Sequence, residues 1–189
     1  ILGIQVQRTK NTLTFSQEHY AREISKRLCL ENAANRDIPL SPGIKLLPRT
    51  EEDTEQVKFP YRECLGALLY LAVCTRPDIT TALSVLGRFQ ANPSTTHVKA
   101  LKSVLRYVSG TAHYGLVYHK SLANEPLYGI CDSDHQIKHL RLKYEMDRES
   151  CFPRAGYVVM RGGAAVIWSS KHPKRTVSSS AEAEYRAGS

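Results

Sequence analysis

The segment Tyr61–Cys74 constrains the fold of this chain most strongly, because apolar side chains occupy nearly every side of the helix that it would form. A helix that is apolar nearly all round has to be covered by other parts of the protein. Two breaks follow it, Thr75–Asp78 and Asn92–Ser94, and each contains a proline. Either Pro77 or Asp78 can begin the next helix. The sequence therefore predicts a buried helix with further helices packed around it.

The residues before that segment predict a β-hairpin and one more helix. Alternating apolar and polar side chains near the N-terminus are followed by a turn, Thr9–Thr12, and a returning strand, Leu13–Phe15. Ser16 is a suitable cap for a helix over about residues 17–30. Residues 32–59 show no regular spacing of apolar side chains and contain several prolines and acidic residues. We expect a long surface loop there.

Beyond Gly110 the pattern changes from helical to strand-like. Four short segments rich in β-branched and aromatic side chains predict strands. They are residues 115–119, 127–132, 156–160 and 164–168. Arg161–Gly163 suits a hairpin turn between the last two, and a short helix is expected from Ala181. The predicted fold class is therefore α+β, a mixed α/β chain with a helical part followed by a sheet, and the boundary is expected near residues 111–124.

Charge is the feature of the composition that bears on function. The chain of 189 residues contains 26 Lys and Arg against 18 Asp and Glu, which gives a net charge of +8. Residues 1–122 contain 16 of these cations and 10 of these acids, so they carry most of the excess. A basic first part is compatible with a polyanionic partner, although a count alone is weak support. No apolar run approaches the ~20 residues of a membrane span, so we expect no membrane partner.

Two further features concern the cellular setting. The chain begins with Ile1 rather than Met and shows no secretory signal, so we expect a processed chain or a fragment. Its five cysteines are odd in number and widely spaced, without a Cys-x-x-Cys pair, which argues against a disulfide framework or a zinc site. We expect free thiols in an intracellular protein, and nothing in the sequence distinguishes cytoplasm from nucleus.

The helix expected over about residues 95–109, with Gly110 just past its end, carries two stripes. Apolar side chains recur at helical spacing on one side, and three cations, Lys99, Lys102 and Arg106, lie beside them. Three cations on one face can follow a phosphate backbone. The competing interpretation is an ordinary solvated face on a helix packed against the core, and the spacing alone does not decide between the two.

A pair of carboxylates is the candidate metal site. An Asp at the end of a strand and a Glu from a following helix supply the oxygen ligands that Mg²⁺ prefers. Asp132 or Asp134 and Glu184 or Glu182 fit that arrangement. Two such ions about 3.5–4 Å apart can activate water and stabilise the leaving oxygen in phosphodiester cleavage. The plainer interpretation of the two aspartates is a turn after a strand.

Many ordered motifs along nearly the whole chain point to one family. Those in the first part are Leu2-Gly3-Ile4, Phe15-Ser16-Gln17, Tyr61-Arg62-Glu63-Cys64-Leu65-Gly66, Thr75-Arg76-Pro77-Asp78-Ile79 and Leu105-Arg106-Tyr107-Val108-Ser109-Gly110-Thr111. Those in the second part are Tyr114-Gly115-Leu116, Asp132-Ser133-Asp134, Gly156-Tyr157-Val158, Trp168-Ser169-Ser170-Lys171 and Ser180-Ala181-Glu182-Ala183-Glu184-Tyr185. On these motifs the chain resembles the Pol polyprotein of copia-type long-terminal-repeat retrotransposons, from the end of the reverse transcriptase into ribonuclease H.

The resemblance implies an organisation and a set of partners. Residues 1–122 would be the last palm strands and the thumb- and connection-like region of a reverse transcriptase, an RNA-directed DNA polymerase. Residues 123–189 would be a truncated ribonuclease H-like sheet. Lys99, Lys102 and Arg106 would then lie near a template–primer duplex or an RNA–DNA hybrid, and the remainder of the Pol polyprotein would be the other partner.

The resemblance also assigns roles to the acids. Asp132 and Glu184 would be the catalytic residues that hold Mg²⁺, with Asp134 and Glu182 as the alternative assignments. The paired aspartates of the polymerase and the last two ribonuclease H acids are absent from this sequence, and His135–His139 departs from the family pattern. We therefore expect a chain that is catalytically incomplete on its own. The alternatives are a non-catalytic nucleic-acid-binding or interaction remnant of a decayed element, and a product without a biochemical role.

Overall fold

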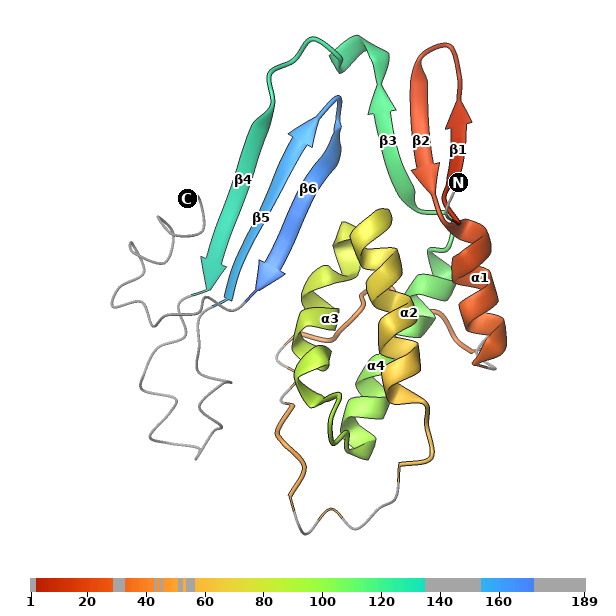
Figure 1. The fold of residues 1–189 in the computed structure, drawn as a ribbon, viewed down its shortest axis with the longest axis vertical. Coiled ribbons are helices and arrows are strands. Elements are labelled where there is room, and N and C mark those ends of the chain that lie inside the picture. The colour runs from red at the N-terminus through yellow and green to blue at the C-terminus, as the bar shows by residue number, and fades with distance from the viewer. Residues whose placement is uncertain are drawn as a thin grey trace. The chain divides into compact units, whose positions relative to one another are not determined.

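The chain divides into two compact units, Ile1–Val117 and Tyr118–Ser189. The computed structural model describes residues 3–28, 33–42, 44, 46–50, 53, 57–134 and 154–171. Within these residues the fold is a mixed α+β fold with four α-helices and two three-stranded sheets (Figure 1). No helix in this part of the chain is long and apolar enough to cross a membrane.

The first sheet begins with the predicted hairpin. β1 (Gln5–Arg8) pairs antiparallel with β2 (Thr12–Ser16), and β3 (Gly115–His119) adds to the other side of β2. A Cβ atom at position 115 would overlap the Phe15 carbonyl oxygen, so only glycine allows β3 to approach β2 this closely. The unit boundary falls inside β3, between Val117 and Tyr118.

Four helices follow the predicted order. They are α1 (Glu18–Arg27), α2 (Tyr61–Cys74), α3 (Thr80–Leu86) and α4 (Thr95–Gly110), with short 3₁₀ turns on both sides of α3. Two predicted helix ends are wrong. Ser16 belongs to β2 and Gln17 occupies the N-cap of α1, because the strand continues one residue further than its apolar pattern. Gly110 is the last residue of α4 and Thr111 is its C-cap, so no left-handed glycine ends this helix.

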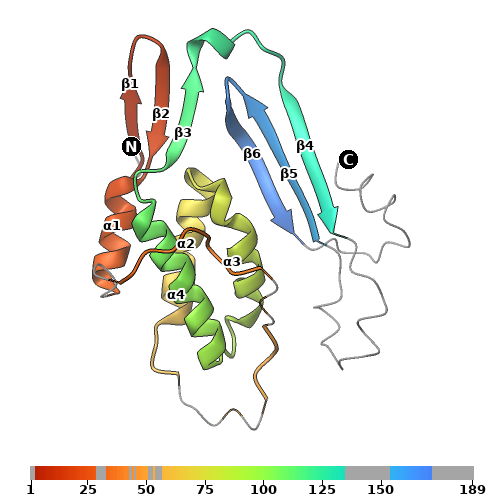
Figure 2. The same ribbon diagram turned by 180° about the vertical axis from the view of Figure 1, so that it is seen from behind.

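The core of the first unit lies between these helices. α4 packs against α1, α2 and α3 (Figure 2). Large apolar side chains that are fully buried come from all four helices and from the turn before α3, and they include Ile24, Leu65, Leu68, Leu71, Ile79, Leu83, Leu86, Leu101, Val104 and Leu105. The prediction that α2 is buried nearly all round is too strong, since Leu69, Tyr70 and Val73 are exposed, Val73 to 72%. The other helices pack mainly against the opposite side of α2, although the Tyr70 ring meets the Tyr20 ring of α1 with 5.4 Å between centroids.

The second unit contains an antiparallel sheet. Its strands are β4 (Tyr128–Asp134), β5 (Arg154–Arg161) and β6 (Ala164–Lys171), in the order β4-β5-β6. Gly162 and Gly163 form the predicted turn between β5 and β6 with φ of 60° and 87°, the left-handed region that glycine adopts readily. The Tyr118 hydroxyl donates to the Ala165 carbonyl at 2.7 Å. This bond connects the first residue of the second unit to β6. The short helix predicted from Ala181 lies outside the described residues.

Candidate functional site

Helix α4 carries the three predicted nucleic-acid-binding cations, and its N-terminus is fixed by His97. The Ser94 backbone N–H donates to His97 Nδ1 at 2.9 Å, and the Ser94 hydroxyl lies 2.9 Å from the same nitrogen. The His97 ring is fully buried and stacks on Phe89 with 3.9 Å between ring centroids. Burial lowers the pKa of His97, and the Leu47 backbone and the Asp53 carboxylate oppose this more weakly. The neutral imidazole therefore serves as a structural acceptor at the start of the helix.

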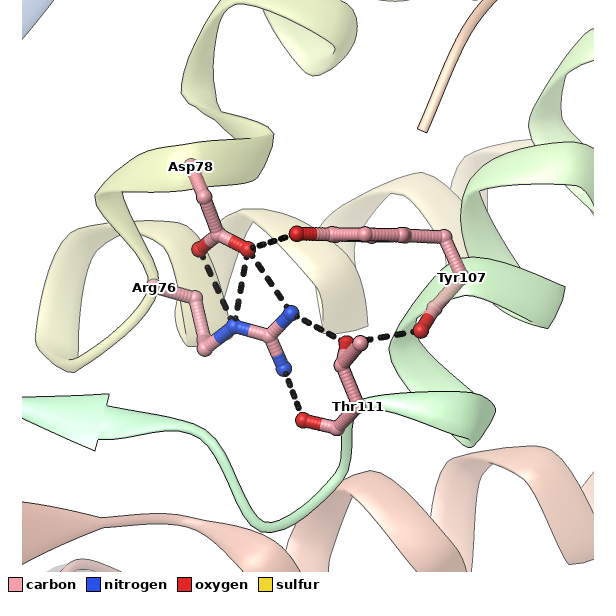
Figure 3. Close-up of polar contacts among 4 residues, drawn as sticks. All are labelled: Arg76, Asp78, Tyr107 and Thr111. Carbon is pink, nitrogen blue, oxygen red and sulfur yellow. Dashed lines mark hydrogen bonds and ion pairs between the residues drawn. The ribbon is translucent and has the colours of Figure 1, made fainter. Parts of the chain in front are cut away.

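The C-terminus of α4 is fixed by a cluster of Arg76, Asp78, Tyr107 and Thr111, which we call the Arg76 cluster (Figure 3). Arg76 and Tyr107 are buried, Thr111 is half-buried and the Asp78 side chain is 32% exposed. Arg76 Nε donates to both Asp78 oxygens at 3.0 and 3.2 Å, and Arg76 Nη2 donates to Asp78 Oδ2 at 2.8 Å. The guanidinium also donates to the Thr111 carbonyl at 2.9 Å and to the Thr111 hydroxyl at 2.7 Å. The Tyr107 hydroxyl completes the cluster by donating to Asp78 Oδ2 at 2.8 Å.

This cluster joins segments that are distant in the sequence. Arg76 is 2% exposed, so its charge is compensated inside the protein by Asp78 and by the rings of Tyr107 and Tyr114, whose centroids lie 5.5 and 5.4 Å from the guanidinium carbon. Burial raises the pKa of Tyr107, and its hydrogen bond to Asp78 adds to that shift. These hydrogen bonds connect the turn before α3 to the C-terminal end of α4. The sequence predicted Thr75–Asp78 as a helix break and as part of a family motif, but nothing local shows that Arg76 bonds a residue 35 positions away.

Both ends of α4 are therefore held by side-chain contacts, and the three cations lie along the helix between these ends. Lys99, Lys102 and Arg106 are spaced at i, i+3 and i+7, which places them on one side of α4. Lys99 is exposed, and Lys102 and Arg106 are half-buried. Lys102 Nζ lies 5.1 Å from the ring centroid of Phe59. Among the described residues, no carboxylate forms an ion pair with any of the three.

The predicted catalytic acids are not brought together within the described residues. Asp132 is exposed on β4, opposite Gly156 of β5, and the strand continues past it to Asp134. Glu184 and its alternative Glu182 lie outside the described residues. An exposed carboxylate at a sheet has the chemistry that Mg²⁺ prefers. However, the described part of the chain contains no group of three or more His, Cys, Asp or Glu side chains able to hold a metal. The Asp132–Glu184 pairing stays a prediction.

The described cysteines are free thiols, but only one of the three is buried. Cys64 is buried in the core of the first unit, Cys74 is half-buried and Cys131 is exposed on β4. Burial raises the pKa of the Cys64 thiol to about 12, with a smaller contribution from Glu63, so this thiol is inert in the folded protein. The other two cysteines, Cys29 and Cys151, lie outside the described residues.

Known proteins similar to this chain include retrotransposon Pol polyproteins and proteins with other names. The chain is 36% identical over 194 residues to the retrovirus-related Pol polyprotein from transposon TNT 1-94 of Nicotiana tabacum, an alignment that covers 99% of this chain and 14% of that protein. It is 34% identical over 190 residues to the corresponding polyprotein from transposon RE1 of Arabidopsis thaliana, covering 98% and 12%. The third relative, named secreted RxLR effector protein 161 of Plasmopara viticola, is 38% identical over 128 residues, or 68% of this chain and 83% of that protein.

These comparisons confirm the resemblance seen in the motifs, since the two Pol relatives align along nearly the whole chain. The chain spans only 14% and 12% of the length of those two relatives, so their complete activities do not follow from the alignment. No protein-family model and no solved structure matches the chain.

Proposed function

The chain belongs to the copia-type Pol polyprotein family of retrotransposons, and we propose that within it residues 1–122 are the thumb- and connection-like end of a reverse transcriptase. Residues 123–189 are, in the same proposal, the beginning of a ribonuclease H-like domain. The Pol relatives support the context, because the remainder of such a polyprotein is the natural partner of this segment. The function proposed for the chain itself is to bind an RNA–DNA hybrid or a template–primer duplex through α4.

One observation carries this proposal, namely that α4 presents three cations from a helix fixed at both ends. From Lys99 to Arg106 the helix rises about 10 Å. Phosphates of one duplex strand advance by about 3.4 Å each, so this distance corresponds to about three phosphates. Among the described residues no carboxylate pairs with these cations, and the proposal is that they meet an external anion instead.

The salt dependence of binding tests the proposal. The probe is a labelled RNA–DNA hybrid of twenty base pairs, titrated at several salt concentrations and followed by fluorescence anisotropy. Each phosphate contact contributes about 0.9 to the slope of log affinity against log salt. Replacing Lys99, Lys102 and Arg106 together by Gln is expected to reduce that slope by about 2 to 3.

A charge-matched control distinguishes a specific face from general basicity. The variant Arg8→Gln/Lys10→Gln/Lys26→Gln removes three exposed cations from β1, its turn and α1, and leaves α4 unchanged. This control is expected to retain most of the slope. An equal loss in both variants would contradict the assignment of α4 as the interface.

The chain alone is proposed to lack ribonuclease H catalysis. In the family pattern Asp132 and Glu184 would hold Mg²⁺, which supplies polarisation of the phosphodiester and of the attacking water. In this proposal, Asp132 and Glu184 are the members of the family's carboxylate set that lie within the 189 residues. We expect no Mg²⁺-dependent cleavage of the hybrid by the purified chain. Robust cleavage that Asp132→Asn abolishes would overturn this expectation.

A second candidate function is that of a non-catalytic interaction module. The relative from Plasmopara viticola favours it, because the aligned region makes up 83% of that protein, so a segment of this size occurs there as most of a chain. This candidate predicts that the purified chain binds no hybrid at low salt, or binds it with a slope that the α4 variant leaves unchanged.

A further inference from the structure

Lys102, at the centre of the cationic face of α4, is in contact with an aromatic ring from another part of the chain. Its ammonium nitrogen lies 5.1 Å from the ring centroid of Phe59, which is within the range of a cation–π interaction. Phe59 lies two residues before the start of α2 and is 43 positions from Lys102 in the sequence. Its ring is half-buried and packs against the core of the first unit, so its position is set by the fold and not by the lysine.

The other described cation–π pairs do not share this arrangement. Arg76 lies over Tyr107 and Tyr114, but its guanidinium is buried and bonded within the Arg76 cluster. Arg88 lies over the neighbouring ring of Phe89, at the turn that follows α3. Among the described pairs, only the contact between Phe59 and Lys102 places a ring beneath a cation of the α4 face.

The physical consequence concerns the flexibility of lysine. A lysine side chain has four rotatable bonds and loses much of its conformational freedom when its ammonium is held against a phosphate. A side chain that is already held over a ring before binding loses less, so the complex is more stable for the same number of ionic contacts. Lys99 and Arg106 lie about one turn on either side, so a fixed Lys102 also fixes the centre of the face.

We propose that Phe59 is a positioning residue for polyanion binding, and that its ring holds the Lys102 ammonium in place to contact a nucleic-acid phosphate. The proposal rests on the function proposed above for α4 and identifies a residue outside the helix on which that function depends.

A double-mutant cycle tests the proposal in the full chain with the same RNA–DNA hybrid. Lys102→Met removes the charge and keeps an apolar stem, and it is expected to lower the salt slope by about 0.9. Phe59→Leu removes the ring and keeps an apolar side chain. It is expected to weaken binding by about three- to tenfold and to leave the slope unchanged, because no charge is lost. The double variant is expected to bind like Lys102→Met, because the ring acts only through the lysine.

Phe59→Tyr is the matched control, since it retains the aromatic face, and it is expected to bind like the wild type. Lys58→Met removes an exposed cation next to Phe59 in the sequence and is expected to cause a smaller loss than Lys102→Met. Additive effects of Phe59→Leu and Lys102→Met would contradict the proposal. If the wild type shows no salt-dependent binding, the proposed function of α4 fails. If the triple variant of α4 behaves as expected and Phe59→Leu binds like the wild type, only the role of Phe59 fails.

A second measurement needs no substitution at position 59. In the wild-type chain the ring is expected to shift the ε-methylene proton resonances of Lys102 upfield, whereas those of Lys58 stay at ordinary values. The upfield shift is expected to persist when the hybrid is added to saturation. Its absence in the free chain, or its loss in the complex, would contradict the positioning role.

Discussion

The helices of the first unit and the strands of the second bury apolar side chains to very different extents. Among the described residues, the helical core contains 22 buried hydrophobic residues, all between Ala21 and Ala112. Among the described residues of the second unit, the buried hydrophobic residues are Ala164 and Ala165. Large apolar side chains of that unit are exposed on the strands and before them, and they are Leu127, Tyr128, Ile130, Tyr157, Val166 and Ile167. Four helices can cover one another, whereas a three-stranded sheet has two faces and depends on further elements to cover them.

The largest expected effect comes from breaking the Arg76 cluster. Asp78→Asn removes the negative charge from the partner of a guanidinium that is 2% exposed. An uncompensated buried charge is expected to destabilise the first unit by about 3–5 kcal/mol, measured by urea denaturation followed by circular dichroism. Glu18→Gln is the control, because it breaks the exposed Arg22–Glu18 pair at 2.7 Å and is expected to cost less than about 1 kcal/mol. Equal losses in the two variants would show that the cluster does not hold the helices together.

The second-largest expected effect is a difference between the two units in the free energy of unfolding that is lost when an apolar side chain is truncated. Leu101→Ala removes a fully buried side chain from α4 and is expected to cost about 2–5 kcal/mol. Ile130→Ala removes a side chain of β4 that is 54% exposed, so a much smaller loss is expected. The same denaturation experiment measures both. A loss for Ile130→Ala as large as that for Leu101→Ala would show that β4 is covered in solution.

A pH dependence is expected from His97. Because burial lowers its pKa below the ordinary value of 6.5, the folded protein binds fewer protons here than the unfolded chain does. The stabilisation is present above pH 6.5 and is lost as the pH falls through the lowered pKa. Protonation of Nδ1 would also remove the acceptor of the Ser94 N–H. The urea concentration at the unfolding midpoint of the first unit is therefore expected to decrease when the pH is lowered from 7.5 to 5. The decrease is expected to be smaller in His97→Gln. An identical decrease in the variant would rule out this role of His97.

The last prediction requires no substitution and compares how fast a thiol reagent modifies one native cysteine in each unit. Cys131 is exposed on β4, whereas Cys64 is buried and its pKa is raised to about 12. Since the thiolate is the reactive form, a thiol reagent at pH 8 is expected to modify Cys131 rapidly and Cys64 only after unfolding. Peptide mapping by mass spectrometry distinguishes the two positions. Rapid modification of Cys64 in the folded chain would contradict the packing described for α2.

Local sequence patterns predicted the elements of the fold but not the contacts between distant segments. The helices and strands were predictable because apolar periodicity, prolines and the Gly162–Gly163 turn act over a few residues. The exposed side of α2 was not, since Val73 is as apolar as its buried neighbours and only the arrangement of the other helices leaves it uncovered. The Arg76 cluster depends on Thr111, 35 positions from Arg76, and no local signal reveals that pairing.

In the candidate site, too, the local spacing of residues was predictable and the contact between distant residues was not. Helical spacing placed Lys99, Lys102 and Arg106 on one side of α4 before the fold was known. Spacing did not reveal that Phe59 lies beside Lys102, because that contact depends on how α2 and its preceding segment pack. The pairing of Asp132 with Glu184 came from the family resemblance alone and stays a prediction.

Native-state hydrogen exchange of the full chain tests the contrast between the two units most directly. Amides of α2 and α4 between Leu65 and Leu71 and between Leu101 and Val108 are expected to exchange only through global unfolding of the helical unit. Amides of β4 between Tyr128 and Asp132 are expected to exchange about 100-fold faster or more, because few apolar contacts protect that strand. Equal protection in the two regions, or slower exchange in β4, would contradict the account.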